Sequence, residues 1–329
     1  NVVQITVINF DPGSISADQT ICEGDTPAAL TSVTPTGDGA FTYQWQISTN
    51  GSTYSDIGGE TGETFTPPAL TQDTWYKRIV TASLNGTDCT EETAPVKITV
   101  INFTPGSISS DQTICEGGTP NPLTSVSPSG DGAFSYQWQE SADGIAYSDI
   151  VGETGETFTP PSLTADTWYK RLVTASLNGT DCTEETNAVR ITVNNMTPGV
   201  IGTDETICEG DVPTPLTVTT AATADGAITY QWQSSTDGTN FFNITGATSD
   251  TYSPPAITAD TWYKRSVTAS LNGVLCTEET NAVQVTVNNF DPGSIDANQT
   301  ICEGDNANAF TSVTPTGDFA SVAYQWYSS

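Results

Sequence analysis

A unit of about 93 residues recurs along the chain, and this periodicity constrains the fold more than any other feature of the sequence. The tetrapeptide ICEG recurs at spacings of 93 or 94 residues, beginning at Ile21, Ile114, Ile207 and Ile301. The tripeptide YQW and the hexapeptide DTWYKR repeat at the same spacings. Self-similarity at a fixed period is the signature of an array of like units. The sequence therefore predicts tandem copies of one domain.

Each repeat restarts at a Pro-Gly step that follows a strand-like segment. These steps divide the chain into the last strand of a preceding repeat, three full repeats and a partial fourth: 1–8, 9–101, 102–194, 195–288 and 289–329. Because the chain begins and ends inside repeats, we expect it to be a window on a longer array.

An apolar residue and a proline recur at every joint between repeats. The pairs are Phe10 and Pro12, Phe103 and Pro105, Met196 and Pro198, and Phe290 and Pro292. A short link that contains proline restricts bending, whereas Gly/Ser linkers allow it. We therefore predict stiffly joined repeats, with a length of roughly 35–45 Å for each repeat if its strands have about ten residues.

Within a repeat, short β-branched and aromatic runs alternate with Gly, Pro, Asn and Asp, and no long segment has helical spacing. Asn50-Gly51 and Asn85-Gly86, with their counterparts, are typical of two-residue hairpin turns. The fold class is therefore all-β, with antiparallel β-sandwich repeats. The position of Val80, two residues after TWYKR, holds Val in all three full repeats, which predicts that it faces the core. Strand alternation then places Tyr76 and Arg78 on the same side as Val80. We interpret Arg78 as structural, stacked on an aromatic ring or paired with Glu91, and a ligand site as the alternative.

Seven cysteines occur, two in each full repeat and one in the fourth. They predict one disulfide within each repeat: Cys22 with Cys89, Cys115 with Cys182, and Cys208 with Cys276. Cys302 matches Cys22, and its partner would lie past the end of the chain. Metal ligation is the rival interpretation, but no CxxC and no His is present. Disulfides indicate an oxidising, extracellular compartment.

The charge and composition of the chain exclude several classes of function. With 39 acidic and 8 basic residues the net charge is −31, which excludes nucleic-acid partners. No apolar run is long enough to insert in a membrane. Carboxylates are the abundant functional groups, but they recur in several repeats without one distinguished pair, so we predict no enzyme and no catalytic residue. We expect no cofactor, with Ca²⁺ in the acidic loops as the alternative.

The motifs PGSI, QTICEGDTPAALTS, YQWQISTNGSTYSDI and TFTPPALTQDTWYKRIVTA together resemble the tandem immunoglobulin-like repeats of long Bacteroidota cell-surface proteins. The resemblance covers nearly the whole chain. It implies export by the type 9 secretion system and a place among gliding-motility adhesins or surface filaments. It also implies that a set of framework residues is structural: Trp45, Trp138, Trp232, Tyr76, Tyr169 and Tyr263.

Three functions remain open at this point. The first is the structural stalk of an extracellular adhesin or filament, whose partners are other copies or other segments of the same long chain. The second is a repeated module that binds surface glycans or proteins through the variable loops 48–58, 141–151 and 235–245, with Tyr54 and Tyr147 as candidate contacts. The third is a spacer in a secreted multidomain enzyme.

Overall fold

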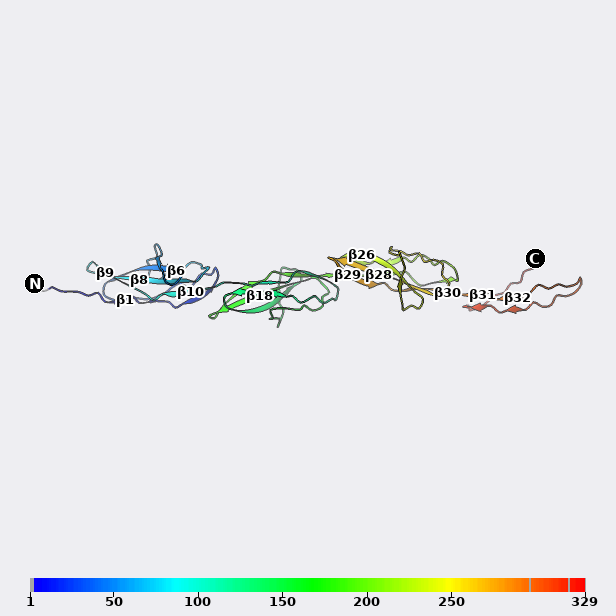
Figure 1. Ribbon diagram of the computed structural model, residues 1–329, viewed down its shortest axis with the longest axis horizontal. Helices are drawn as coiled ribbons and strands as arrows, with labels where there is room; N and C mark the ends of the chain where they lie inside the picture. The colour runs from blue at the N-terminus through cyan, green and yellow to red at the C-terminus, as the bar shows by residue number, and fades with distance from the viewer. Residues whose placement is uncertain (1–2, 296, 319, 329) are drawn as a thin grey trace. The chain divides into compact units, whose positions relative to one another are not determined.

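The structure is a computed structural model that describes residues 3–295, 297–318 and 320–328, in which every regular element is a strand (Figure 1). Two compact units make up the chain. The first contains 1–112, 120–161 and 166–191, and the second contains 113–119, 162–165 and 192–329. The first therefore holds repeat 1 and most of repeat 2, and the second holds repeat 3 and the start of the fourth.

Ten strands form each full repeat. Repeat 1 has β1 (Phe10–Asp11), β2 (Ser14–Ile15), β3 (Gln19–Cys22), β4 (Ser32–Val33), β5 (Thr36–Gly37), β6 (Ala40–Ser48), β7 (Ser55–Asp56), β8 (Thr74–Leu84), β9 (Thr87–Glu92) and β10 (Val96–Ile101). Repeat 2 has β11 (Phe103–Thr104), β12 (Ser107–Ile108), β13 (Gln112–Cys115), β14 (Ser125–Val126), β15 (Ser129–Gly130), β16 (Ala133–Ser141), β17 (Ser148–Asp149), β18 (Thr167–Leu177), β19 (Thr180–Glu185) and β20 (Val189–Asn194). Repeat 3 has β21 (Met196–Thr197), β22 (Val200–Ile201), β23 (Glu205–Cys208), β24 (Val218–Thr220), β25 (Thr223–Ala224), β26 (Ala227–Ser235), β27 (Phe242–Asn243), β28 (Thr261–Leu271), β29 (Val274–Glu279) and β30 (Val283–Asn288).

The main sheet of repeat 1 has the order β3-β10-β8-β6-β7, and β9 also pairs with β8. The long strand β8 is shared along one edge by two strands: β10 pairs with its first residues, Thr74–Tyr76, and β9 with its later residues, 79–84. On the other edge of β8, β6 pairs with it along all of β6, from Ala40 to Ser48. β10 pairs in parallel with β3, so that Cys22 lies beside Ile101.

A smaller layer covers one face of this sheet. It consists of the pairs β1–β5 and β2–β4 and of an isolated bridge between Leu30 and Phe65. Between the layers lie Trp45 on β6 and Tyr76 on β8, both fully buried, and the ring of Phe65 lies 5.5 Å from each. A Trp buried on the central strand of the sheet is a hallmark of immunoglobulin domains. Each full repeat is therefore an immunoglobulin-like β-sandwich.

The β8–β9 hairpin turns at Asn85 and Gly86, whose φ angles of 53° and 79° are those of a two-residue type I′ turn. The counterparts Asn178 and Asn272 also have positive φ. The turn at Asn50-Gly51 differs from expectation, because only Gly51 has positive φ. There the Asn50 side chain accepts hydrogen bonds from the backbone N–H groups of Ser52 and Thr53, both at 2.9 Å, and these bonds hold the turn instead.

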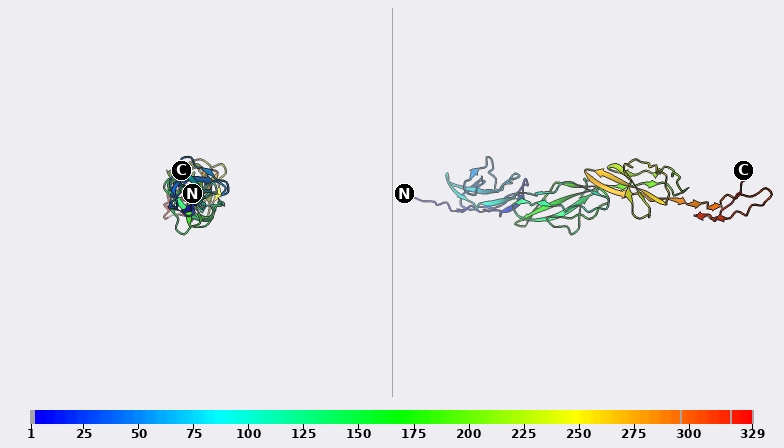
Figure 2. Two further views of the ribbon diagram at one scale, coloured as in Figure 1. Left: turned by 90° about the vertical axis from the view of Figure 1, so that its left-hand side faces the viewer. Right: turned by 45° about the vertical axis from the view of Figure 1, so that its right-hand side comes forward.

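The two ends of the chain differ from the full repeats. Residues 3–8 form no strand, although the sequence predicts the last strand of a repeat over 1–8, of which 1–2 lie outside the described residues. The matching strand β10 is held by β3 and β8, and no described strand pairs with residues 3–8. The fourth repeat has the short paired strands β31 (Phe290–Asp291), β32 (Ser294–Ile295), β33 (Ser312–Val313) and β34 (Thr316–Gly317), seen in orange and red in Figure 2.

None of the described residues of the fourth repeat is buried, in contrast to the cores of the full repeats. Its Trp326 is 62% exposed, whereas Trp45 at the same place in repeat 1 is fully buried. Trp45 is covered by residues of β8 and β10, and the sequence of the fourth repeat ends before their counterparts. Among the described residues, no helix has the length and apolarity that a membrane crossing requires.

Candidate functional site

The disulfides join successive repeats, which corrects the pairing predicted from the sequence. Cys22 is bonded to Cys182 and Cys115 to Cys276, with Cα atoms 5.6 Å apart in both bonds. The remaining cysteines are free: Cys89, Cys208 and Cys302. The predicted pairs Cys22–Cys89, Cys115–Cys182 and Cys208–Cys276 are therefore wrong, and so is the expectation of one disulfide inside each repeat.

The sheet register explains why Cys22 cannot reach Cys89. Cys22 lies beside Ile101, three residues beyond Ile98, which pairs with the first residue of β8, Thr74. Cys89 pairs with Ala82, near the other end of β8. About eleven strand residues, or about 35 Å, therefore separate the two cysteines along the sheet. A disulfide requires Cα atoms within about 7 Å. Each cysteine thus lies at an end of the repeat, where it faces a neighbour.

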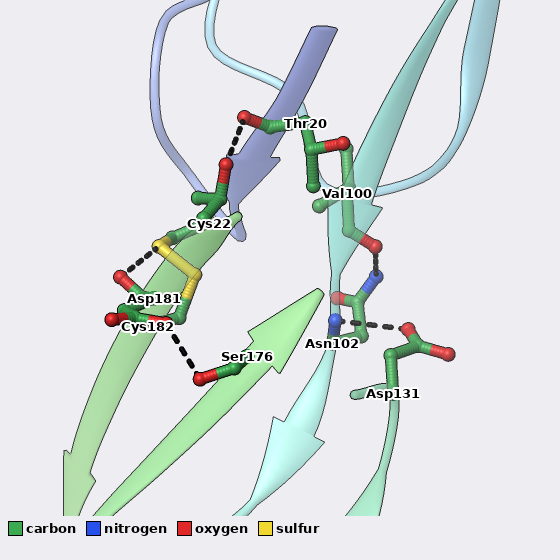
Figure 3. Close-up of a disulfide and its surroundings, with 9 residues drawn as sticks. Thr20, Cys22, Val100, Asn102, Asp131, Ser176, Asp181 and Cys182 are labelled. Carbon is green, nitrogen blue, oxygen red and sulfur yellow. Dashed lines mark hydrogen bonds between the residues drawn. A yellow bond between two sulfur atoms is a disulfide. The ribbon is translucent and has the colours of Figure 1, made fainter. Parts of the chain in front are cut away.

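At the first joint, the hairpin of β18 and β19 in repeat 2 meets the end of β3 in repeat 1. Figure 3 shows the bond between Cys22, at the end of β3, and Cys182 on β19. Around it, Asn178 donates from Nδ2 to Oγ1 of Thr20 at 3.1 Å, and Thr180 donates from Oγ1 to the carbonyl of Thr20 at 3.2 Å. The hairpin therefore docks through a covalent bond and two hydrogen bonds.

The second joint repeats this arrangement. Asn272 donates from Nδ2 to Oγ1 of Thr113 at 3.1 Å, beside the bond between Cys115 and Cys276. Asn194, which is fully buried, adds a hydrogen bond to the carbonyl of Ala269 at 3.2 Å. The same docking geometry at two joints indicates that it belongs to the repeat and not to one sequence context.

The apolar joint residues pack around the docked hairpins. Phe103 is half-buried and contacts the cluster of Ile101, Ala175 and Cys182. Met196 is 8% exposed and packs with Val267, Ala269 and Cys276. Phe290, which follows repeat 3, is 53% exposed. The residues that the sequence marks at the joints are therefore half-buried or buried where a complete repeat follows. Phe10 is half-buried against Phe41, with ring centroids 5.8 Å apart.

A buried arginine fixes the proline link, a role that sequence reasoning missed. Arg78 is fully buried, and its guanidinium lies 4.7 Å from the ring centroid of Tyr43. It donates to Oγ of Ser32 at 2.6 Å, to the carbonyl of Glu63 at 2.7 Å and to the carbonyl of Pro12 at 3.1 Å. Burial lowers the pKa of Arg78 from its ordinary value.

The counterparts of this arginine differ between repeats. Arg171 donates in the same way to the carbonyl of Pro105 at 3.2 Å. In repeat 3, Arg265 instead pairs with the carboxylate of Asp250 at 2.8 Å. Pro198 and Pro292 occupy the matching places in the last two repeats. Glu91 is not the partner of Arg78, and its neighbour Glu92 pairs with Lys77 at 2.6 Å. The sequence feature that could have revealed the role of this arginine is its position in TWYKR, which is identical in all three full repeats and contains a core tyrosine.

The framework residues all lie in the cores. Trp45, Trp138 and Trp232 are fully buried, and each donates its indole N–H to a backbone carbonyl at 2.9 Å. Tyr76, Tyr169 and Tyr263 are buried as well, and burial raises the pKa of each to about 12. The hydroxyl group of Tyr76 is buried without a hydrogen-bond partner.

The candidate glycan contacts have a basic side chain over one face. Lys77 lies 4.5 Å from the ring centroid of Tyr54, and Lys170 lies 4.2 Å from that of Tyr147. A sugar that stacked on these faces would have to displace the lysine.

Beside the first disulfide, a groove of 240 Å³ is lined by acidic side chains that include Glu23, Asp25 and Glu184. Within the described part of the chain, no three acidic or cysteine side chains are grouped so as to hold a metal ion.

Comparisons with solved structures show arrays of immunoglobulin domains. An I-band fragment of titin is 10% identical, with a TM-score of 0.47, and the match covers 86% of this chain and 99% of that one. Extracellular domains 3–5 of Drosophila OTK are 14% identical, with a TM-score of 0.30, and the match covers 85% and 97% of the two chains. The insect immune protein hemolin is 12% identical, with a TM-score of 0.30, and the match covers 87% and 79%.

No curated protein sequence matches the chain. One protein family does, and it is described as a domain of unknown function (DUF8696). It matches three times, over residues 11–102, 104–195 and 197–289. These three ranges span most of the 329 residues. The chain therefore belongs to this family and carries three consecutive copies of its domain.

Proposed function

We propose that the chain is part of the non-enzymatic stalk of an extracellular adhesin or cell-surface filament. The observation that carries this proposal is the covalent joint. Cys22 and Cys115 each bind a cysteine of the following repeat, and beside both bonds an asparagine of the hairpin donates the same hydrogen bond to a threonine of the preceding repeat. A bond placed between domains adds little to the stability of one domain but fixes its neighbour, which is what a stalk requires.

Location and partners follow from the same bonds and from the charge. Disulfides persist in oxidising compartments, which supports an extracellular place. A net charge of −31 makes neighbouring arrays repel, and this keeps a chain with many strand edges soluble. Because the disulfides join each repeat to the next, we infer that the partners are other segments of the same long chain, or other copies where salt screens this repulsion. A link to gliding motility and the type 9 secretion system is part of the proposal through the sequence resemblance alone.

Small-angle scattering of the oxidised chain tests the stalk. A compact globule of this length would have a radius of gyration of about 20 Å. Three sandwiches of about 40 Å each in a row would give a value above about 30 Å. A radius near 20 Å would contradict the proposal. Binding of the chain to a glycan array, lost in Tyr54→Ala and Tyr147→Ala together, would favour the binding module instead.

A further inference from the structure

We propose that the two disulfides turn the second repeat into the tension-bearing link of the chain and limit how far a pulled chain can extend. The inference deepens the proposed function, since it describes how such a stalk would bear load. It rests on the order of the four bonded cysteines along the chain, which is Cys22, Cys115, Cys182, Cys276 with bonds from the first to the third and from the second to the fourth.

This order makes the two closed loops overlap. One bond closes a loop with a sequence separation of 160 residues and the other a loop of 161, and residues 115–182 belong to both. Three chain segments therefore connect the same two bonds: 22–115, 115–182 and 182–276. The middle segment is the shortest, with about 67 residues against about 93 and 94.

Tension follows the shortest covalent path. A pull on both termini enters through residues 1–22, crosses from Cys22 to Cys182, runs backward along the chain to Cys115, crosses to Cys276 and leaves toward the C-terminus. The segments 22–115 and 182–276 connect the same two disulfides as 115–182 but are longer. They therefore stay slack when 115–182 is fully extended. Most of repeats 1 and 3 is therefore bypassed, and the segment of repeat 2 that holds β16 and β18 bears the load.

Either disulfide alone keeps most of this limit on the extension of the chain. With both bonds intact, the covalent path from end to end has about 141 residues, against about 328 steps in the reduced chain. Loss of either bond lengthens the path by only about 27 residues, because the remaining bond still bypasses 160 or 161. Loss of both releases about 187 residues, or about 650 Å of extended chain. One broken bond therefore leaves most of the restraint in place.

Single-molecule force spectroscopy on the full chain, with handles at both termini, tests this. The samples are the oxidised chain, Cys22→Ser, Cys115→Ser and the double variant, with Cys208→Ser as a control that removes a free thiol. Proteolytic peptide mapping under non-reducing conditions first confirms which bonds each sample carries. We expect final contour lengths of about 141 residues for the intact chain and the control, about 168 for either single variant and about 328 for the double variant.

Bonds within repeats would give different lengths. There each removed bond would release about 67 residues, and the intact chain would reach about 126. Steps of 67 residues, or an oxidised chain that extends to about 328, would overturn the inference. These outcomes are separate from the scattering test: a compact chain with a 141-residue limit would remove the stalk and keep the linkage, whereas an elongated chain with 67-residue steps would do the reverse.

Discussion

The side-chain amide of Asn178 donates a hydrogen bond to the hydroxyl of Thr20, although 158 residues separate them in the sequence. Asn178 has a φ of 52°, a left-handed conformation that asparagine tolerates better than most residues. One residue therefore turns the hairpin and also docks it on the preceding repeat. The pair formed by Asn272 and Thr113, again at 3.1 Å, repeats this double role.

Replacement of Asn178 by Gly isolates the docking role, because glycine keeps the turn conformation but has no amide to donate. We expect the contact between repeats to weaken by about 1 kcal/mol, the usual net value of one hydrogen bond. Hydrogen exchange should become faster in residues 19–22 while the core of β8 is unchanged. Asn85→Gly, at the same hairpin position of repeat 1, is the control and should leave residues 19–22 unchanged. Equal effects of the two variants would contradict a docking role.

The pairing of the cysteines predicts three free thiols per chain. A maleimide added to the non-reduced, unfolded protein should label Cys89, Cys208 and Cys302 and leave the four bonded cysteines unlabelled. Bonds within repeats would leave Cys302 as the one thiol to react. In the native protein Cys208 and Cys302 should react faster than Cys89, because they are exposed and Cys89 is half-buried. Mass spectrometry of the labelled peptides gives both the number and the positions.

The sequence was sufficient for what depends on local pattern. Period-two alternation placed Tyr76, Arg78 and Val80 on one face of a strand, and all three are fully buried. The pairing of Cys22 could not be read this way, because it depends on register. The sequence pattern alone does not say how far along the sheet each cysteine lies. In the structure β10 and β9 pair with different parts of β8, and this places the two cysteines of a repeat at opposite ends of the sheet. Two cysteines per repeat fit either pairing equally well.

Arg78 should be among the most sensitive positions of repeat 1. Arg78→Ala removes a fully buried side chain and leaves the carbonyls of Glu63 and Pro12 without their donor. We expect the free energy of unfolding of repeat 1 to fall by about 3 kcal/mol. Arg190→Ala is the matched control, because Arg190 is exposed and pairs with Asp166 at the surface, where an ion pair contributes less than about 1 kcal/mol. Hydrogen exchange of residues 74–84 measures the loss of stability in Arg78→Ala, and that of residues 167–177 measures the loss in Arg190→Ala. Similar losses in the two variants would contradict the prediction.

Replacement of Tyr76 by Phe should stabilise the protein slightly. The hydroxyl of Tyr76 is buried without a partner, so the folded state bears its desolvation cost without a compensating hydrogen bond. We expect Tyr76→Phe to raise the free energy of unfolding by about 1 kcal/mol. Tyr76→Ala, which opens a cavity in the core, should lower it by about 3 kcal/mol or more. Chemical denaturation measures both, and a clear loss in Tyr76→Phe would show that the hydroxyl makes a contact that matters.

The buried tyrosines also predict how stability depends on alkaline pH. Burial raises the pKa of Tyr76, Tyr169 and Tyr263 to about 12, against about 10 in an unfolded chain. Between these values the folded chain holds protons that the unfolded chain has released. This contribution to stability is therefore complete below pH 10 and is lost as the pH rises from 10 to 12, by about 1.4 kcal/mol per pH unit for each tyrosine.

Denaturation curves at pH 9, 10 and 11 should show that loss, and a variant with all three tyrosines changed to Phe should lack it. In the folded protein, the ionisation of these three tyrosines, followed by absorbance at 295 nm against the triple Phe variant, should occur near pH 12. Their ionisation near pH 10 with the fold intact would show that water reaches these hydroxyl groups.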